Sequence, residues 1–166
     1  GGEGVAARTR HECKPDAVER VGRIRRHEAV WRGEDALRAF HHPTEISMVM
    51  EGVNKVYKGY EKVCVFQPHR ISRLKDLRKD FSFAFQNADL VILCPIYSAG
   101  EKIKLGFNYL DFAKEIIKNS KVKLFLVENN FQLAKFIKKN MYGKKIVIGM
   151  GAGTISNWMR KLPELM

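Results

Sequence analysis

The sequence has few of the features that hold secreted or metal-bound proteins together. Its three cysteines, Cys13, Cys64 and Cys94, are an odd number without a close pair, which disfavours a disulfide framework. Cys64 and Cys94 lie in apolar runs, so we expect buried thiols and a reducing, cytoplasmic location. No second pair of ligands accompanies His11 and Cys13 at zinc spacing, so we expect no metal site.

Long hydrophobic runs and familiar catalytic motifs are also missing. No apolar stretch approaches the ~20 residues of a membrane helix, and no apolar segment of signal-peptide type begins the chain. No believable Ser-His-Asp or Cys-His order occurs, and no G-x-x-x-x-G-K-[ST] loop is present to hold a nucleotide phosphate. The 166 residues, 45% apolar, suffice for one domain with a full core. We therefore expect a folded domain without catalytic residues of its own.

The chain is strongly basic, with a formal net charge of +12 and a pI near 9.8. The positive charge makes nucleic acid a candidate partner, and it also suits a protein that binds anionic substrates. The lysines interleave with apolar positions in predicted helices, as in "KDLRKD" (75–80) and "KFIKKN" (135–140). That pattern favours a solvated basic face. A non-enzymatic basic α/β module that binds nucleic acid or an acidic partner stays open as the alternative.

The composition changes near residue 40. Residues 1–40 contain eight Arg and one Lys, whereas residues 41–166 contain four Arg and seventeen Lys. We treat 1–40 as an atypical N-terminal segment of uncertain origin, either joined from another coding source or an ordinary segment with biased usage. The chain also begins with Gly rather than Met, as a fragment would. Within the segment, the loose helical spacing of apolar residues over 16–33 predicts a short amphipathic helix.

Residues 41–166 alternate between helical and strand patterns. We expect strands over 62–66, 88–96, 121–127 and 144–153, and helices over 43–57, 72–88, 108–119, 129–140 and 154–162. The strands are short apolar runs joined by helical connections, which indicates a parallel sheet covered on both faces. The predicted fold is α/β, with a Rossmann-like, doubly wound, mostly parallel sheet.

Polar motifs follow each predicted strand, where this fold binds its ligands. Arg70 and Arg73 stand three apart at a strand-to-helix junction and could clamp a carboxylate or phosphate, or else pair with Asp76 or Asp80. The turn "GMGAG" (149–153) predicts close backbone packing and a free helix N-terminus, with a cofactor-binding role as the less favoured alternative.

A second polar motif lies at the start of a predicted helix. His41 and His42 come just before Pro43, which suits a first helical turn. Adjacent side chains at a turn diverge, so the two histidines are poor joint metal ligands. Taken alone, a structural role is the simpler interpretation. Residues 41–166 therefore offer groups that bind an anion, without groups that perform a reaction.

Four motifs together resemble the C-terminal domain of the Mur ligases, and the resemblance covers residues 41–166. They are "HHPTEI" (41–46), "VFQPHRISRLKDL" (65–77), "ADLVILCPIYSAGE" (88–101) and "IVIGMGAGTISNW" (146–158). Within the family they are most similar to the ligases that join L-alanine to UDP-N-acetylmuramate. The murein-peptide ligases are similar but depart from "HHPTE" and "FQPHR".

The resemblance implies a cytoplasmic, ATP- and Mg²⁺-dependent enzyme of peptidoglycan synthesis, and hence of cell-wall biogenesis, cell shape and cell division. Other domains would bind the UDP-sugar and ATP, and this domain would bind the amino acid. In the family, the matching residues hold that amino acid, which implies that His41, Arg70 and Arg73 bind L-alanine. No cofactor-binding residue is assigned to this chain.

The sequence departs from the family just before His41. An acidic pair, an aromatic and a small residue are usual there, whereas this chain has "LRAF" (37–40). The central ATPase domain is also missing from the 166 residues. We therefore expect a fragment that is inactive alone, unless a separate chain supplies the ATPase domain.

Overall fold

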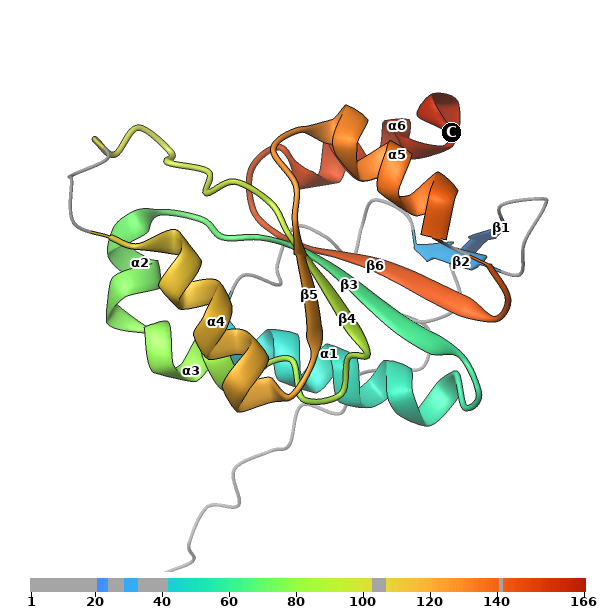
Figure 1. The fold of residues 1–166 in the computed structure, drawn as a ribbon, viewed down its shortest axis with the longest axis horizontal. Coiled ribbons are helices and arrows are strands. Elements are labelled where there is room, and N and C mark those ends of the chain that lie inside the picture. The colour runs from blue at the N-terminus through green and yellow to red at the C-terminus, as the bar shows by residue number, and fades with distance from the viewer. Residues whose placement is uncertain (1–20, 24–28, 33–41, 103–106, 141) are drawn as a thin grey trace, which may run out of the picture.

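The computed structural model describes residues 21–23, 29–32, 42–102, 107–140 and 142–166 (Figure 1). The strands are β1 (Val21–Arg23), β2 (Ala29–Arg32), β3 (Glu61–Gln67), β4 (Leu90–Leu93), β5 (Lys123–Leu126) and β6 (Lys145–Gly151). The helices are α1 (Pro43–Val56), α2 (Ile71–Asp76), α3 (Arg78–Phe83), α4 (Tyr109–Ser120), α5 (Asn130–Asn140) and α6 (Ile155–Leu165). The predicted alternation of strands and helices from residue 43 onward is confirmed.

The strands form one twisted sheet in the order β1-β2-β6-β3-β4-β5. Strands β2 to β6 pair in parallel, and β1 pairs with β2 in antiparallel fashion. The predicted doubly wound, mostly parallel α/β fold is thus confirmed. Two layers of helices cover the sheet, as expected for strands whose apolar runs leave neither face polar.

Two hydrophobic cores lie on opposite faces of the sheet. Helices α1 to α4 bury residues such as Ile46, Phe81 and Phe112 on one face. Helices α5 and α6 bury residues such as Leu133 and Met159 on the other. Alternate residues of β3 serve each face, which is why the strand reads as an unbroken apolar run.

Strands β3 and β6 are neighbours, but the helices that follow them lie on opposite faces of the sheet. Helix α2, which follows β3, packs in the first core, and helix α6, which follows β6, packs in the second. Such a divergence is the topological switch point at which doubly wound sheets open a crevice for ligands. The motifs "QPHR" and "GMGAG" therefore lie at the favoured place for a site.

Two sequence-based predictions were wrong in detail. The helix predicted over 16–33 is replaced, in its described part, by the short strands β1 and β2. Strand β2 pairs with β6, so backbone pairing at the edge of the sheet outweighs a weak helical periodicity. The single helix predicted over 72–88 is split at Leu77 into α2 and α3, where no proline or glycine marks a break. The division of the chain at residue 40 stays a prediction.

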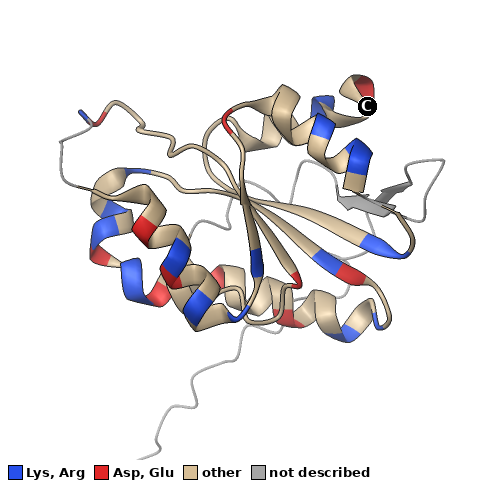
Figure 2. Ribbon diagram, viewed as in Figure 1, with Lys and Arg blue, Asp and Glu red and all other residues tan. Residues whose placement is uncertain are grey.

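Basic residues occur along the helices and also at the starts of β3, β5 and β6, where Lys62, Lys123 and Lys145 lie. Figure 2 shows Lys and Arg alternating with Asp and Glu on α2, α3 and α4. Exposed ion pairs, such as Lys55 with Glu51 at 2.9 Å, occur among them. This distribution fits the predicted solvated basic face. No helix in the described part of the chain is both long and apolar enough to cross a membrane.

Candidate functional site

The buried side-chain amide of Gln67 links the elements that meet at the switch point. Gln67 is the last residue of β3 and only 3% exposed. Its Oε1 accepts a hydrogen bond from the backbone N–H of Ile155 at 2.8 Å, and its Nε2 donates to Thr154 Oγ1 at 2.9 Å. Nε2 also lies 3.4 Å from the carbonyl oxygen of Pro95. One side chain thus links the end of β3 to the start of α6 and to the end of β4.

Gln67→Leu is expected to lower the free energy of unfolding by about 2 kcal/mol. The substitution keeps the side-chain volume but leaves the buried N–H of Ile155 without its acceptor, and a buried unsatisfied donor costs roughly 1–3 kcal/mol. Urea unfolding measures the change. Gln132→Leu is the control, because that exposed side-chain amide bonds only locally, to Glu128, and its loss should change stability by less than about 0.5 kcal/mol. Equal losses in both variants would contradict this role.

The loops after β3 and β4 are joined to each other beyond the strands. The backbone N–H of Arg70 donates to the carbonyl oxygen of Tyr97 at 2.8 Å, and the N–H of Tyr97 donates to Pro68 at 2.8 Å. The rings of His69 and Tyr97 stack with centroids 5.7 Å apart. The parallel pairing of β3 with β4 therefore continues into the two loops, and it fixes the backbone of Arg70.

Arg70 has a strained backbone. Its φ of 63° lies in the region that residues with a side chain seldom adopt, and it directly precedes α2. Such strain persists only where the surroundings hold it, and it is concentrated at functional sites. Here the hydrogen bond from the Arg70 N–H to Tyr97 stabilises the strained backbone.

The two arginines do not form the ion pairs that were the alternative to a ligand clamp. Within the described ranges, neither Arg70 nor Arg73 makes an ion pair with Asp76 or Asp80. Arg70 is exposed and Arg73 is half-buried. Both guanidiniums therefore have charge to offer to an anionic ligand.

Glu101 caps the start of α2 from the loop after β4. Its Oε2 accepts from the backbone N–H of Ser72 at 3.1 Å, and its Oε1 accepts from Ser72 Oγ. The backbone N–H of Ser72 is thus taken, so an anion bound here would rely on the side chains. Glu101 lies in the quoted motif "PIYSAGE" but was not predicted as a site residue, because sequence alone does not show which loops meet.

The glycine turn after β6 is filled by the protein's own atoms. A Cβ added to Gly151 would lie 2.2 Å from the carbonyl oxygen of Gln67, and one added to Gly153 would lie 2.4 Å from the Tyr97 ring. The predicted close packing is confirmed. Gln67 accepts the N–H of Ile155, the first of the helix, and Thr154 makes no side-chain cap, so the predicted free helix N-terminus stays a prediction for the rest of the first turn.

The histidines at the start of α1 are only partly described. His41 lies outside the described residues, so its role stays a prediction. His42 caps α1, because its Nδ1 accepts from the N–H of Thr44 at 3.3 Å. Helix α1 has 14 residues and spans about 21 Å, and β3 has seven residues and spans about 23 Å. A short turn joins the two in opposite directions, so α1 begins about level with the end of β3.

Cys64 and Cys94 are buried free thiols, as predicted. Burial raises the pKa of both, that of Cys94 to about 12, so neither is a reactive thiolate at neutral pH. Cys13 lies outside the described residues. In the described part of the chain, no three His, Cys, Asp or Glu side chains form a group that could hold a metal ion.

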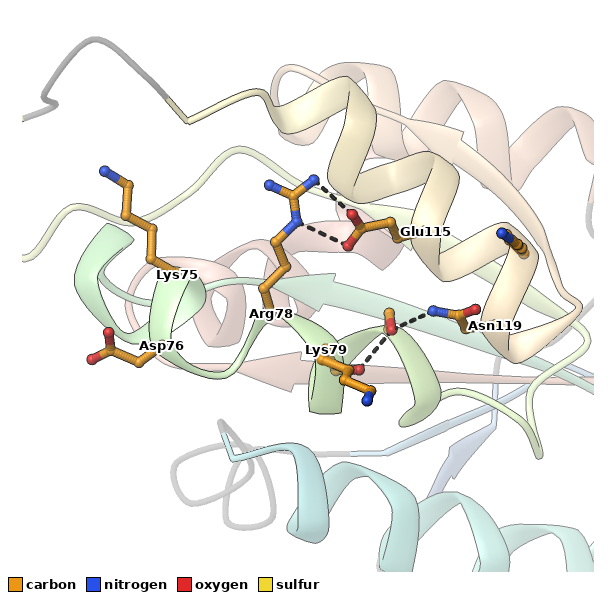
Figure 3. Close-up of a pocket in the computed structure, with 8 residues that line it drawn as sticks. Lys75, Asp76, Arg78, Lys79, Glu115 and Asn119 are labelled. Atoms are coloured by element: carbon orange, nitrogen blue, oxygen red, sulfur yellow. Dashed lines mark hydrogen bonds and ion pairs between the residues drawn. The ribbon is translucent and has the colours of Figure 1, made fainter.

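A separate groove of about 510 Å³ lies between α2–α3 and α4 (Figure 3). Arg78 donates two hydrogen bonds to Glu115, from Nε and Nη2, each at 2.8 Å. Asn119 Nδ2 donates to Ser82 Oγ at 2.8 Å. These polar groups are committed to each other, so we assign them to holding α3 against α4.

Comparisons with known proteins point to one group of enzymes. The UDP-N-acetylmuramate–L-alanine ligase of Pelagibacter ubique is 70% identical over 126 residues, which are 76% of this chain and 27% of that protein. The ligase of the same name from Paracoccus denitrificans is 36% identical over 124 residues, which are 75% of this chain and 26% of that protein. This chain thus spans about a quarter of the length of these relatives. No family model matches the chain.

Solved structures support the fold. The UDP-N-acetylmuramate–alanine ligase of Thermotoga maritima superposes on 85% of this chain and 28% of that chain, with a TM-score of 0.58 and 22% identity. At such identity the likeness shows the fold alone. The reported relatives are ligases, so they lend no support to the alternative of a basic module for nucleic acid or an acidic partner.

Proposed function

Because the chain carries a C-terminal domain of the Mur ligase family, we propose that this domain binds the amino acid in an ATP-dependent UDP-N-acetylmuramate–L-alanine ligase. The relatives of that name match the chain through about a quarter of their length. The remaining steps of the reaction would then belong to parts of the enzyme beyond this domain. The free thiols fit a cytoplasmic location.

The reaction needs an amino acid held by its carboxylate with its amine aimed. In the proposed enzyme, ATP converts the lactyl carboxylate of the sugar to an acyl phosphate and ADP is released. The amine of L-alanine then attacks the carbonyl carbon, phosphate leaves, and the amine loses a proton to give the amide. Fixing the amino acid turns this attack into an effectively unimolecular step.

The observation that carries the proposal is the pair of arginines at the switch point. Arg70 is held in a strained conformation beside the end of β3, and Arg73 lies one turn into α2. Neither charge is used in an ion pair within the described ranges. Guanidiniums bind carboxylates through two parallel N–H···O bonds, which suits the anchoring of an amino acid. His41 would complete the pocket from the start of α1.

The described residues offer no complete site for ATP and Mg²⁺. No G-x-x-x-x-G-K-[ST] loop occurs in the sequence, and the glycine turn after β6 is filled by Gln67 and Tyr97. The described residues also lack a metal-binding group. We therefore propose that ATP and Mg²⁺ bind another part of the enzyme and assign no step with them to this chain.

Arg70→Ala and Arg73→Ala are each expected to weaken L-alanine binding by about tenfold or more. A hydrogen bond to a charged group contributes roughly 1.5–3 kcal/mol, and about 1.4 kcal/mol corresponds to tenfold in Kd. An NMR titration of the full chain with L-alanine measures the change, and its amide spectrum reports the fold. Arg160→Ala on α6 removes the same charge elsewhere and should leave Kd unchanged. Binding of L-alanine that survives both substitutions would refute the proposed site.

A further inference from the structure

The carboxylate of Glu101 is held by a residue that closely follows Arg70 in the chain. Ser72, whose N–H and hydroxyl both bind Glu101, lies two residues after Arg70. Tyr97, which accepts the N–H of Arg70 at 2.8 Å, lies four residues before Glu101. The two loops are therefore joined on both sides of Arg70 and Glu101, and the positive charge of Arg70 acts on the Glu101 carboxylate.

The loop after β4 is shaped to bring Glu101 back toward α2. Ala99 and Gly100 both have positive φ, 50° and 85°, and the N–H of Glu101 donates to the carbonyl oxygen of Ser98 at 3.0 Å. Strain at Ala99 and at Arg70 thus occurs on the two loops that meet. Such strain needs contacts that hold it, and a functional constraint is its usual reason.

An α-amino acid carries one negative and one positive group, which are complementary to the charges of Arg70 and Glu101. Its carboxylate and its ammonium group are attached to the same carbon, so a site that recognises the whole zwitterion needs both signs of charge side by side. Two arginines alone would bind any small carboxylate equally well. We propose, resting on the proposed function, that Glu101 receives the α-ammonium group of the amino acid whose carboxylate Arg70 and Arg73 hold.

Glu101 has the charge and the free lone pairs for this role. Hydrogen bonds from the hydroxyl and the N–H of Ser72 lower the pKa of Glu101. The backbone N–H of Ile71 and then the charge of Arg70 lower this pKa further. The side chain is therefore ionised at neutral pH. Ser72 donates to each oxygen, and the backbone N–H of Ile71 also interacts with the carboxylate, which has about four lone-pair sites and so keeps capacity for a further donor. A carboxylate of low pKa is a weak base, so Glu101 orients the ammonium group, and another group removes its proton.

The test compares ligands that share the carboxylate and differ in the ammonium group. NMR titrations of the full chain with L-alanine and with propionate should show L-alanine bound about tenfold more tightly. Glu101→Gln keeps an acceptor for Ser72 but removes the charge. It should erase the preference for L-alanine by weakening L-alanine binding alone. Arg70→Ala should weaken both ligands. Glu128→Gln, at the end of β5, is the matched control and should change neither.

The outcomes separate this inference from the proposed function. If wild-type chain binds L-alanine and propionate equally, or if Glu101→Gln keeps the preference, Glu101 has no such role, even while Arg70→Ala still weakens both ligands. If L-alanine binding is absent or insensitive to Arg70, the proposed function fails as well. The wild-type comparison requires no variant, so a Glu101→Gln chain that does not fold leaves the inference open to refutation.

Discussion

Gly151→Ala is expected to lower the free energy of unfolding by about 3 kcal/mol or more. The residue has a φ of 129°, where side chains are rarely accommodated, and a Cβ there would lie 2.2 Å from the carbonyl oxygen of Gln67. That oxygen belongs to the backbone of β3, which is paired with β6 at this point. The clash can be relieved only by parting the strands that form the switch point, so both stability and ligand binding should suffer.

Gly52→Ala is the matched control for this prediction. Gly52 lies within α1, and a Cβ added there meets nothing within 4 Å. Alanine is the better helix former by roughly 1 kcal/mol, so this variant should be as stable as the wild type or more so. Urea unfolding followed by circular dichroism compares the three proteins. A Gly151→Ala protein as stable as the Gly52→Ala protein would show that the switch point is not packed as described.

Helices and strands were predicted correctly where the local preference of the sequence agrees with the tertiary packing. Helix α1 has a proline in its first turn and an apolar stripe that becomes buried, so local and tertiary preferences coincide. Strand β3 is an apolar run buried on both faces. The segment around Val21 and Val30 has weak periodicity, and there pairing at the sheet edge decided the structure.

The meeting of the polar motifs at one edge of the sheet was predictable, but the contacts between them were not. "QPHR" and "GMGAG" follow strands, so their arrival at one edge of a parallel sheet follows from the fold class. The order of the strands, which makes β3 and β6 neighbours, depends on long-range packing. The bridge from Gln67 to Ile155 and the contact of Glu101 with Ser72 join residues far apart in sequence, so no local pattern reveals them.

A hybrid ligase is expected to depend on Arg70 for its use of L-alanine. In the hybrid, residues 41–166 replace the matched segment of the Pelagibacter ubique enzyme, which is 70% identical to this chain over 126 residues. The rest of that enzyme would supply the ATP chemistry that we assign to another part of the enzyme, so the hybrid should release ADP in the presence of ATP, UDP-N-acetylmuramate and L-alanine. The 166-residue chain alone should release none. ADP formed by the chain alone would contradict the assignment of ATP chemistry to another part of the enzyme.

The most direct measurement is the KM for L-alanine of this hybrid with and without Arg70→Ala. Loss of one charged anchor for the carboxylate should raise KM by about tenfold or more, because a hydrogen bond to a charged group contributes roughly 1.5–3 kcal/mol. Arg160→Ala should leave KM unchanged. An active hybrid whose KM for L-alanine is the same with Ala at position 70 would contradict the assignment of the amino-acid site to the ends of β3 and β4.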